Sequence, residues 1–153
     1  MPKYYNASIR NLMYRLRKFN PVLEQCLKEE IEKYGYYLTD IIRIQLDLGI
    51  DGNMRRIHPP YALRTIQKKI KKGQPIDRVT LKDTGDFYNS LYVVFEEDGF
   101  RIASNDEKAK YLIAKYGEPI LRLDDRDFTR FLRYYIRPAL AERLKEYIEN
   151  GRA

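Results

Sequence analysis

Apolar side chains recur at helical spacing in the first half of the chain. Residues 21–48 carry one every three or four positions, with Asn20 and Pro21 suited to a helix start and Gly49 to its end. The pattern predicts one long helix. Gly35 lies inside it and weakens a helix by about 1 kcal/mol relative to Ala, so we expect a bend or a close packing contact there.

A second helical pattern covers residues 61–72. It is short and strongly basic, and it ends before Gly73 and Pro75, which do not favour a continuing helix. Residues 79–81 then form a brief extended segment. We therefore expect two helices before any sheet begins.

The middle of the chain changes to a strand-like composition. Residues 91–97 are rich in β-forming side chains, Asp98-Gly99 is a strong two-residue turn signal, and residues 100–104 continue the pattern. This order predicts an antiparallel hairpin.

Two short elements follow the hairpin. Residues 107–116 predict a helix that Gly117 ends, and residues 120–123 predict a third strand. The sheet is therefore expected to remain small.

A last apolar periodicity runs to residue 148 and predicts a C-terminal helix. Asp124 or Asp125 would cap its start. Pro138 falls inside the pattern, where it lacks a backbone N–H and clashes with the preceding turn, so a kink or break is expected near Arg137. The whole order predicts an α+β fold with a small antiparallel sheet packed against a long N-terminal helix and a C-terminal helix.

Length and composition limit the domain count and the environment. The chain has 153 residues, 44% of them hydrophobic, which suits one domain. We expect a basic N-terminal arm over residues 1–20 and a single α+β domain over residues 21–153. No run reaches the ~18 apolar residues of a membrane span, so we expect no membrane association. We also expect the protein to be made in a cytoplasm.

The charge balance favours acidic partners. Basic residues outnumber acidic ones 29 to 22, for a formal charge of +7, and the second predicted helix holds a concentrated group of them. The candidates for contact with nucleic acid or another acidic partner are Arg64, Lys68, Lys69, Lys71 and Lys72. The alternatives are a solvated helix face and an arm that docks on an acidic neighbour.

Catalytic and metal-binding chemistry is not supported by the sequence. The only histidine, His58, precedes two prolines, and the only cysteine, Cys26, lies at an apolar helix position. Asp47, Asp51 and Asn53 resemble part of a calcium loop, but the required glycine position and the closing Glu are absent, which favours a plain turn. The remaining acidic groups occur where turns and helix starts use Asp routinely: Asp83, Asp86, Asp124, Asp125 and Asp127. We predict no cofactor and no enzymatic activity.

One ordered set of short motifs resembles a known family. The segment Leu81-Lys82-Asp83-Thr84-Gly85-Asp86-Phe87-Tyr88-Asn89-Ser90 precedes the hairpin, and Ala109-Lys110-Tyr111-Leu112 and Tyr116-Gly117 follow it. In this order they resemble the head-tail joining proteins of tailed bacteriophages, also called neck, tail-completion or minor tail proteins. The motif positions are Leu81, Thr84, Gly85, Phe87, Ser90, Tyr111 and Gly117.

The resemblance implies a virion structural protein of a phage or prophage, made in the host bacterial cytoplasm. Such a subunit forms a homo-oligomeric ring at the junction of portal and tail, contacts portal, adaptor and tail proteins, and lies beside packaged DNA. The residues suggest structural roles: Thr84 caps a turn, Gly85 permits a positive φ, and Phe87 and Leu91 anchor the core. The alternative function is a basic nucleic-acid-binding protein of phage or prophage origin.

Overall fold

The predicted long helix forms two consecutive helices. The computed structural model describes residues 9, 10, 13, 14, 17 and 21–150, and within it α2 (Pro21–Lys33) and α3 (Gly35–Asp47) are separated at Tyr34. Gly35 permits a close approach, because a Cβ there would lie 3.3 Å from Val93 Cγ2 of the hairpin. Of the two expectations for Gly35, a bend or a close packing contact, the close contact is confirmed.

The hairpin is confirmed, with its turn one residue earlier than predicted. Strands β1 (Leu91–Glu96) and β2 (Gly99–Ser104) pair antiparallel with Leu91 opposite Ser104 and Glu96 opposite Gly99. The loop is therefore Glu97-Asp98. The strands form the whole sheet of the described residues.

The third strand predicted at residues 120–123 is wrong. Helix α6 (Ala109–Tyr116) ends at Gly117, as expected, and a 3₁₀ turn, η1 (Glu118–Leu121), follows. Pro119 lies in its first turn, where its missing N–H costs little and its fixed φ suits a helical turn. Ile120 is nevertheless fully buried, so its hydrophobic character served the core and not a sheet.

The C-terminal helix passes through Pro138 without a break. Helix α7 (Asp125–Phe131) continues into a π-helical turn, η2 (Leu132–Ile136), and then into α8 (Arg137–Asn150). The Arg137 N–H donates to the Leu132 carbonyl, five residues back. The helix therefore departs from α geometry one turn before the proline, which lacks the N–H of a regular ladder.

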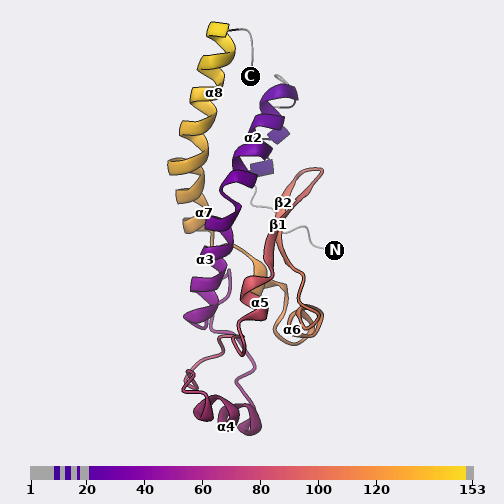
Figure 1. The fold of residues 1–153 in the computed structure, drawn as a ribbon, viewed down its shortest axis with the longest axis vertical. Helices are drawn as coiled ribbons and strands as arrows, with labels where there is room; N and C mark the ends of the chain where they lie inside the picture. The colour runs from indigo at the N-terminus through magenta and orange to yellow at the C-terminus, as the bar shows by residue number, and fades with distance from the viewer. Residues whose placement is uncertain (1–8, 11–12, 15–16, 18–20, 151–153) are drawn as a thin grey trace.

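Figure 1 shows an elongated molecule in which α2 and α8 lie side by side at one end, while the hairpin lies beside α3. The core fills the space between them. Leu38 and Ile42 of α3 and Phe131 of α7 are fully buried, and Phe100 of β2 packs on Phe128 with ring centroids 5.8 Å apart. The predicted α+β class with a small antiparallel sheet is confirmed.

Described residues from the predicted N-terminal arm are helical and contact the core. Ile9 and Met13 are almost completely buried, and Arg17 forms a two-pronged ion pair with Glu24 at 2.8 and 2.9 Å. Arg17 holds the pKa of the Glu24 carboxyl below its ordinary value, mainly through these hydrogen bonds. The rest of residues 1–20 lie outside the described part.

Candidate functional site

Helix α4 (Leu63–Lys71) forms one end of the molecule, opposite the ends of α2 and α8 (Figure 1). It lies between two loops, and we call residues 54–76 the α4 lobe. The segment from Gly52 to Ile76 contains seven of the 29 basic residues and no acidic one. The remainder of the chain therefore carries 22 basic and 22 acidic residues, and the formal net charge of +7 resides in this segment.

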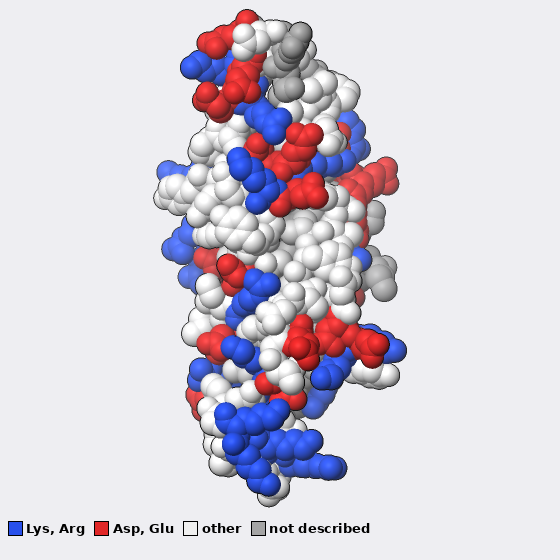
Figure 2. Space-filling model, in the orientation of Figure 1, with Lys and Arg blue, Asp and Glu red and all other residues white. Residues whose placement is uncertain are grey.

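The positive charge of the lobe forms a continuous surface. Figure 2 shows the basic side chains gathered at the end of the molecule that carries α4. Arg64, Lys68 and Lys71 are exposed and form no ion pair with the described residues. Contact of these three residues with a partner stays a prediction, and their exposure is compatible with it.

Two predicted contact residues have other roles. The Lys69 side chain turns inward and is only 5% exposed; its Nζ donates to the Lys82 carbonyl at 2.6 Å and to Gln74 Oε1 at 3.1 Å. Lys72 pairs with Asp83 and lowers the pKa of that carboxyl. The sequence predicted Lys69 as a contact residue together with its neighbours, because the position of a residue along α4 does not show which side of the helix the following loop covers.

A tyrosine fixes the lobe to the segment that precedes the hairpin. The Tyr61 hydroxyl accepts the backbone N–H groups of Thr80 and Leu81 at 2.9 and 3.0 Å, and Lys69 Nζ lies 4.8 Å from its ring centroid. Residues 79–81 form no strand, and the φ of 56° at Leu81 lies outside the extended region, so the brief extended segment predicted there is wrong at Leu81. The hydroxyl thus supplies the backbone partner that a neighbouring strand would otherwise provide.

Lys69→Met is expected to lower the free energy of unfolding by about 1–2 kcal/mol, because it removes the donor to the Lys82 carbonyl inside the lobe. The exposed Lys68→Met is the matched control and should change stability by less than about 0.5 kcal/mol. Urea unfolding of both variants measures the difference. Equal effects would show that the inward contacts of Lys69 contribute nothing.

The motif before the hairpin forms a turn at the surface, with buried residues on either side of it. Gly85 has a φ of 99° and takes the cap position of the short helix α5 (Asp86–Asn89), as its predicted positive φ requires. Thr84 lies one residue earlier; its hydroxyl donates to Asp86 Oδ2 at 2.5 Å and accepts the Asp86 N–H at 3.5 Å. Phe87 and Leu91 are buried in the core, as expected.

Other motif positions lie beside this turn or apart from it. Ser90 Oγ donates to the Phe87 carbonyl at 2.8 Å and lies 2.6 Å from Ser104 Oγ, which ties α5 to both strands. Tyr111 is exposed on α6, and Gly117 ends that helix with a φ of 87°. The turn therefore has an evident structural role, while Tyr111 faces solvent.

Tyr88 was not singled out from the sequence, yet it links this turn to α3 and to the segment at Thr80. Its buried hydroxyl donates to the Thr80 carbonyl at 2.6 Å, and its own carbonyl accepts from Arg43 Nε at 2.9 Å. Burial raises the pKa of the Tyr88 hydroxyl far above its ordinary value of 10. A tyrosine between two motif residues gives no sequence signal for this role.

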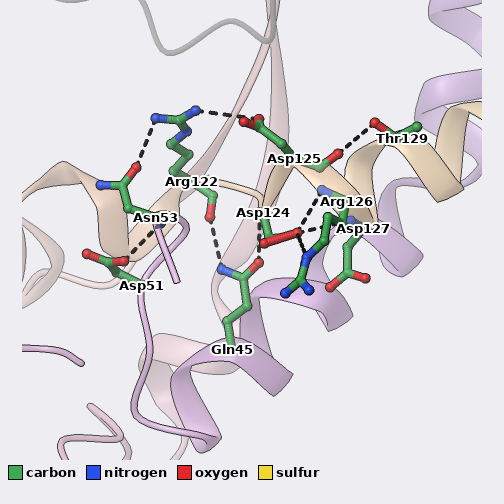
Figure 3. A network of polar contacts seen from close by, with 9 residues as sticks. All are labelled: Gln45, Asp51, Asn53, Arg122, Asp124, Asp125, Arg126, Asp127 and Thr129. Atoms are coloured by element: carbon green, nitrogen blue, oxygen red, sulfur yellow. Dashed lines mark hydrogen bonds and ion pairs between the residues drawn. The ribbon is translucent and has the colours of Figure 1, made fainter. Parts of the chain in front are cut away.

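The acidic groups near Gln45 serve the backbone (Figure 3). Asp124 caps α7 by accepting the N–H groups of Arg126 and Asp127 at 2.7 and 3.2 Å. Asp51 accepts the Asn53 N–H at 2.8 Å in its own turn. These contacts fit the turn and cap roles expected from the sequence, and no group of three metal-ligating side chains occurs within the described residues.

Gln45 and Arg122 join the two loops of this network. Gln45 Nε2 donates to the Arg122 carbonyl and its Oε1 accepts the Asp124 N–H, both at 3.0 Å. Arg122 Nη1 donates to Asn53 Oδ1 at 3.0 Å. The network therefore holds the loop after α3 against the start of α7. The lobe begins at the end of this loop, so the same contacts fix the position from which the lobe extends.

The fold and this geometry define an α+β chain with a basic lobe at one end, attached through Lys69 and Tyr61. No helix in the described ranges is both long and apolar enough to cross a membrane. No family model matches the chain, and no curated protein or solved structure matches it.

Proposed function

We propose that the chain is a non-enzymatic virion protein: a head-tail connector or tail-completion subunit that forms a ring between portal and tail. The proposal starts from the ordered motif that resembles this family. It is supported by the structural use of the motif residues, since Gly85 adopts the positive φ of the turn and Phe87 is buried in the core.

The exposed apolar side chains of α3 carry the proposal. Tyr36, Ile44 and Leu48, the last at the helix end, are all more than half exposed. Single exposed apolar residues are ordinary, but three large ones along one helix form a surface that another subunit can bury. Tyrosine in particular suits such contacts, because its ring is apolar and its hydroxyl can stay hydrated.

A ring-forming subunit places its repeated contact on the same two surfaces of every copy. We expect the purified chain to form rings or concentration-dependent oligomers, as measured by analytical ultracentrifugation and negative-stain electron microscopy. The double variant Ile44→Ser with Leu48→Ser should dissociate them, because it removes the apolar surface that drives association.

The matched control is Leu63→Ser with Ile70→Ser, which changes the same residue types on α4 and should leave the oligomer intact. A chain that stays monomeric at its highest soluble concentration, both alone and mixed with the portal protein of the same phage or prophage, contradicts the proposal. Oligomers that survive the Ile44 and Leu48 changes contradict the assignment to α3.

A further inference from the structure

The outward face of α4 combines two kinds of side chain. Leu63 is 79% exposed and Ile70 is 59% exposed, and their separation of seven residues puts them on the same side of the helix. Arg64, Lys68 and Lys71 occupy the adjoining side and are also exposed. The face therefore has an apolar strip that runs beside a cationic strip.

The lobe holds this face in place before any partner binds. Lys69 and Tyr61 attach α4 to the segment around Leu81, and Gln74 Nε2 donates to the Asp83 carbonyl at 2.7 Å. Lys72 and Asp83 add an ion pair across the same junction. A fixed helix loses little conformational entropy on binding, so the two strips are preorganised for recognition.

From this arrangement we propose that the α4 face binds an acidic amphipathic helix of another protein. Such a helix presents apolar side chains to Leu63 and Ile70 and carboxylates to the three free cations. Charge complementarity supports this partner, because the lobe contains the whole net positive charge of the chain. The inference does not depend on ring formation through α3.

A nucleic acid fits the face less well. Its phosphates would meet Arg64, Lys68 and Lys71, but nothing in a phosphate backbone would cover Leu63 and Ile70. The aromatic ring of the lobe, Tyr61, is turned inward and bonded, so α4 offers no platform on which bases could stack. The exposed aliphatic pair thus favours a protein over DNA.

The test measures binding of two probes to the full chain by fluorescence anisotropy. The first probe is a designed helical peptide with one leucine face flanked by glutamates, and the second is a DNA duplex of arbitrary sequence. We expect the peptide to bind, and its affinity to fall at least about tenfold in Leu63→Ser with Ile70→Ser, and again in Arg64→Gln with Lys68→Gln and Lys71→Gln.

Matched controls carry the same changes elsewhere: Ile44→Ser with Leu48→Ser, and Lys108→Gln with Lys110→Gln and Lys115→Gln. Both should bind the peptide as the parent chain does. The proposal is overturned if the peptide does not bind, or if the Leu63 and Ile70 changes leave its affinity intact. It is also overturned if the duplex binds more tightly than the peptide, with an affinity that falls steeply with salt and depends on the three cations alone. The Leu63 and Ile70 variant and the Arg64, Lys68 and Lys71 variant leave the α3 face unchanged, so their oligomeric state reports separately on the proposed ring.

Discussion

Gly52→Ala is expected to lower the free energy of unfolding by about 3 kcal/mol or more. A Cβ at residue 52 would lie 2.6 Å from the carbonyl carbon of Arg122 and 2.7 Å from its Cβ, with the carbonyl oxygen closer still. Because these atoms are mostly backbone, no side-chain rotation can relieve the overlap, and overpacking of this kind costs about 1–3 kcal/mol.

The same substitution also breaks a hydrogen bond. The Gly52 N–H donates to the Pro119 carbonyl at 2.9 Å, and moving the loop away from Arg122 would leave both groups without a partner. Thermal and urea unfolding measure the loss. For a chain of this size about 3 kcal/mol corresponds to a fall in melting temperature of roughly 6–12 °C.

Gly73→Ala is the matched control for this prediction. It makes the same chemical change at a φ of 64°, but a Cβ there would meet no atom within 4 Å. Only the left-handed backbone strain of about 1–2 kcal/mol then applies. If Gly73→Ala costs as much as Gly52→Ala, the close approach to Arg122 does not limit stability.

Periodicity predicted the parts of this fold whose side chains alternate between core and solvent in a regular way. Helix α3 follows from it, since Leu38 and Ile42 face the core one turn apart. The hairpin follows from its turn signal, Asp98-Gly99, although the loop itself is Glu97-Asp98. Periodicity could not predict the 3₁₀ turn, because a buried Ile120 is equally compatible with a strand. Local pattern therefore fixed the position of buried residues better than their backbone geometry.

The sequence predicted the basic composition of the α4 surface but not which of its side chains are exposed. The basic character of α4 is evident from the sequence, but the inward turn of Lys69 depends on the Lys82 carbonyl, thirteen residues away. The exposure of Leu63 and Ile70 is equally hidden, because an amphipathic pattern normally indicates a face that packs on its own domain. Only the tertiary arrangement reveals that the apolar face of α4 remains uncovered.

Gln45→Leu is expected to lower the free energy of unfolding by about 2–4 kcal/mol. The side chain is 3% exposed and bridges the Arg122 carbonyl and the Asp124 N–H. A leucine of similar size fills the space but leaves both backbone groups buried without partners, at about 1–3 kcal/mol each. The control Gln25→Leu, on the exposed face of α2, should stay within about 0.5 kcal/mol of the parent chain.

The two large effects should also be coupled, because Gln45 and Gly52 meet the same carbonyl. Once Gly52→Ala has displaced the Arg122 backbone, the bond from Gln45 Nε2 is already weakened, so the second change removes less. Urea unfolding of the double variant should therefore show a loss smaller than the sum of the single losses by about 0.5 kcal/mol or more. If the losses in the free energy of unfolding were additive, Gln45 and Gly52 would stabilise the chain through separate contacts. The network in Figure 3 would then not be a single cooperative unit.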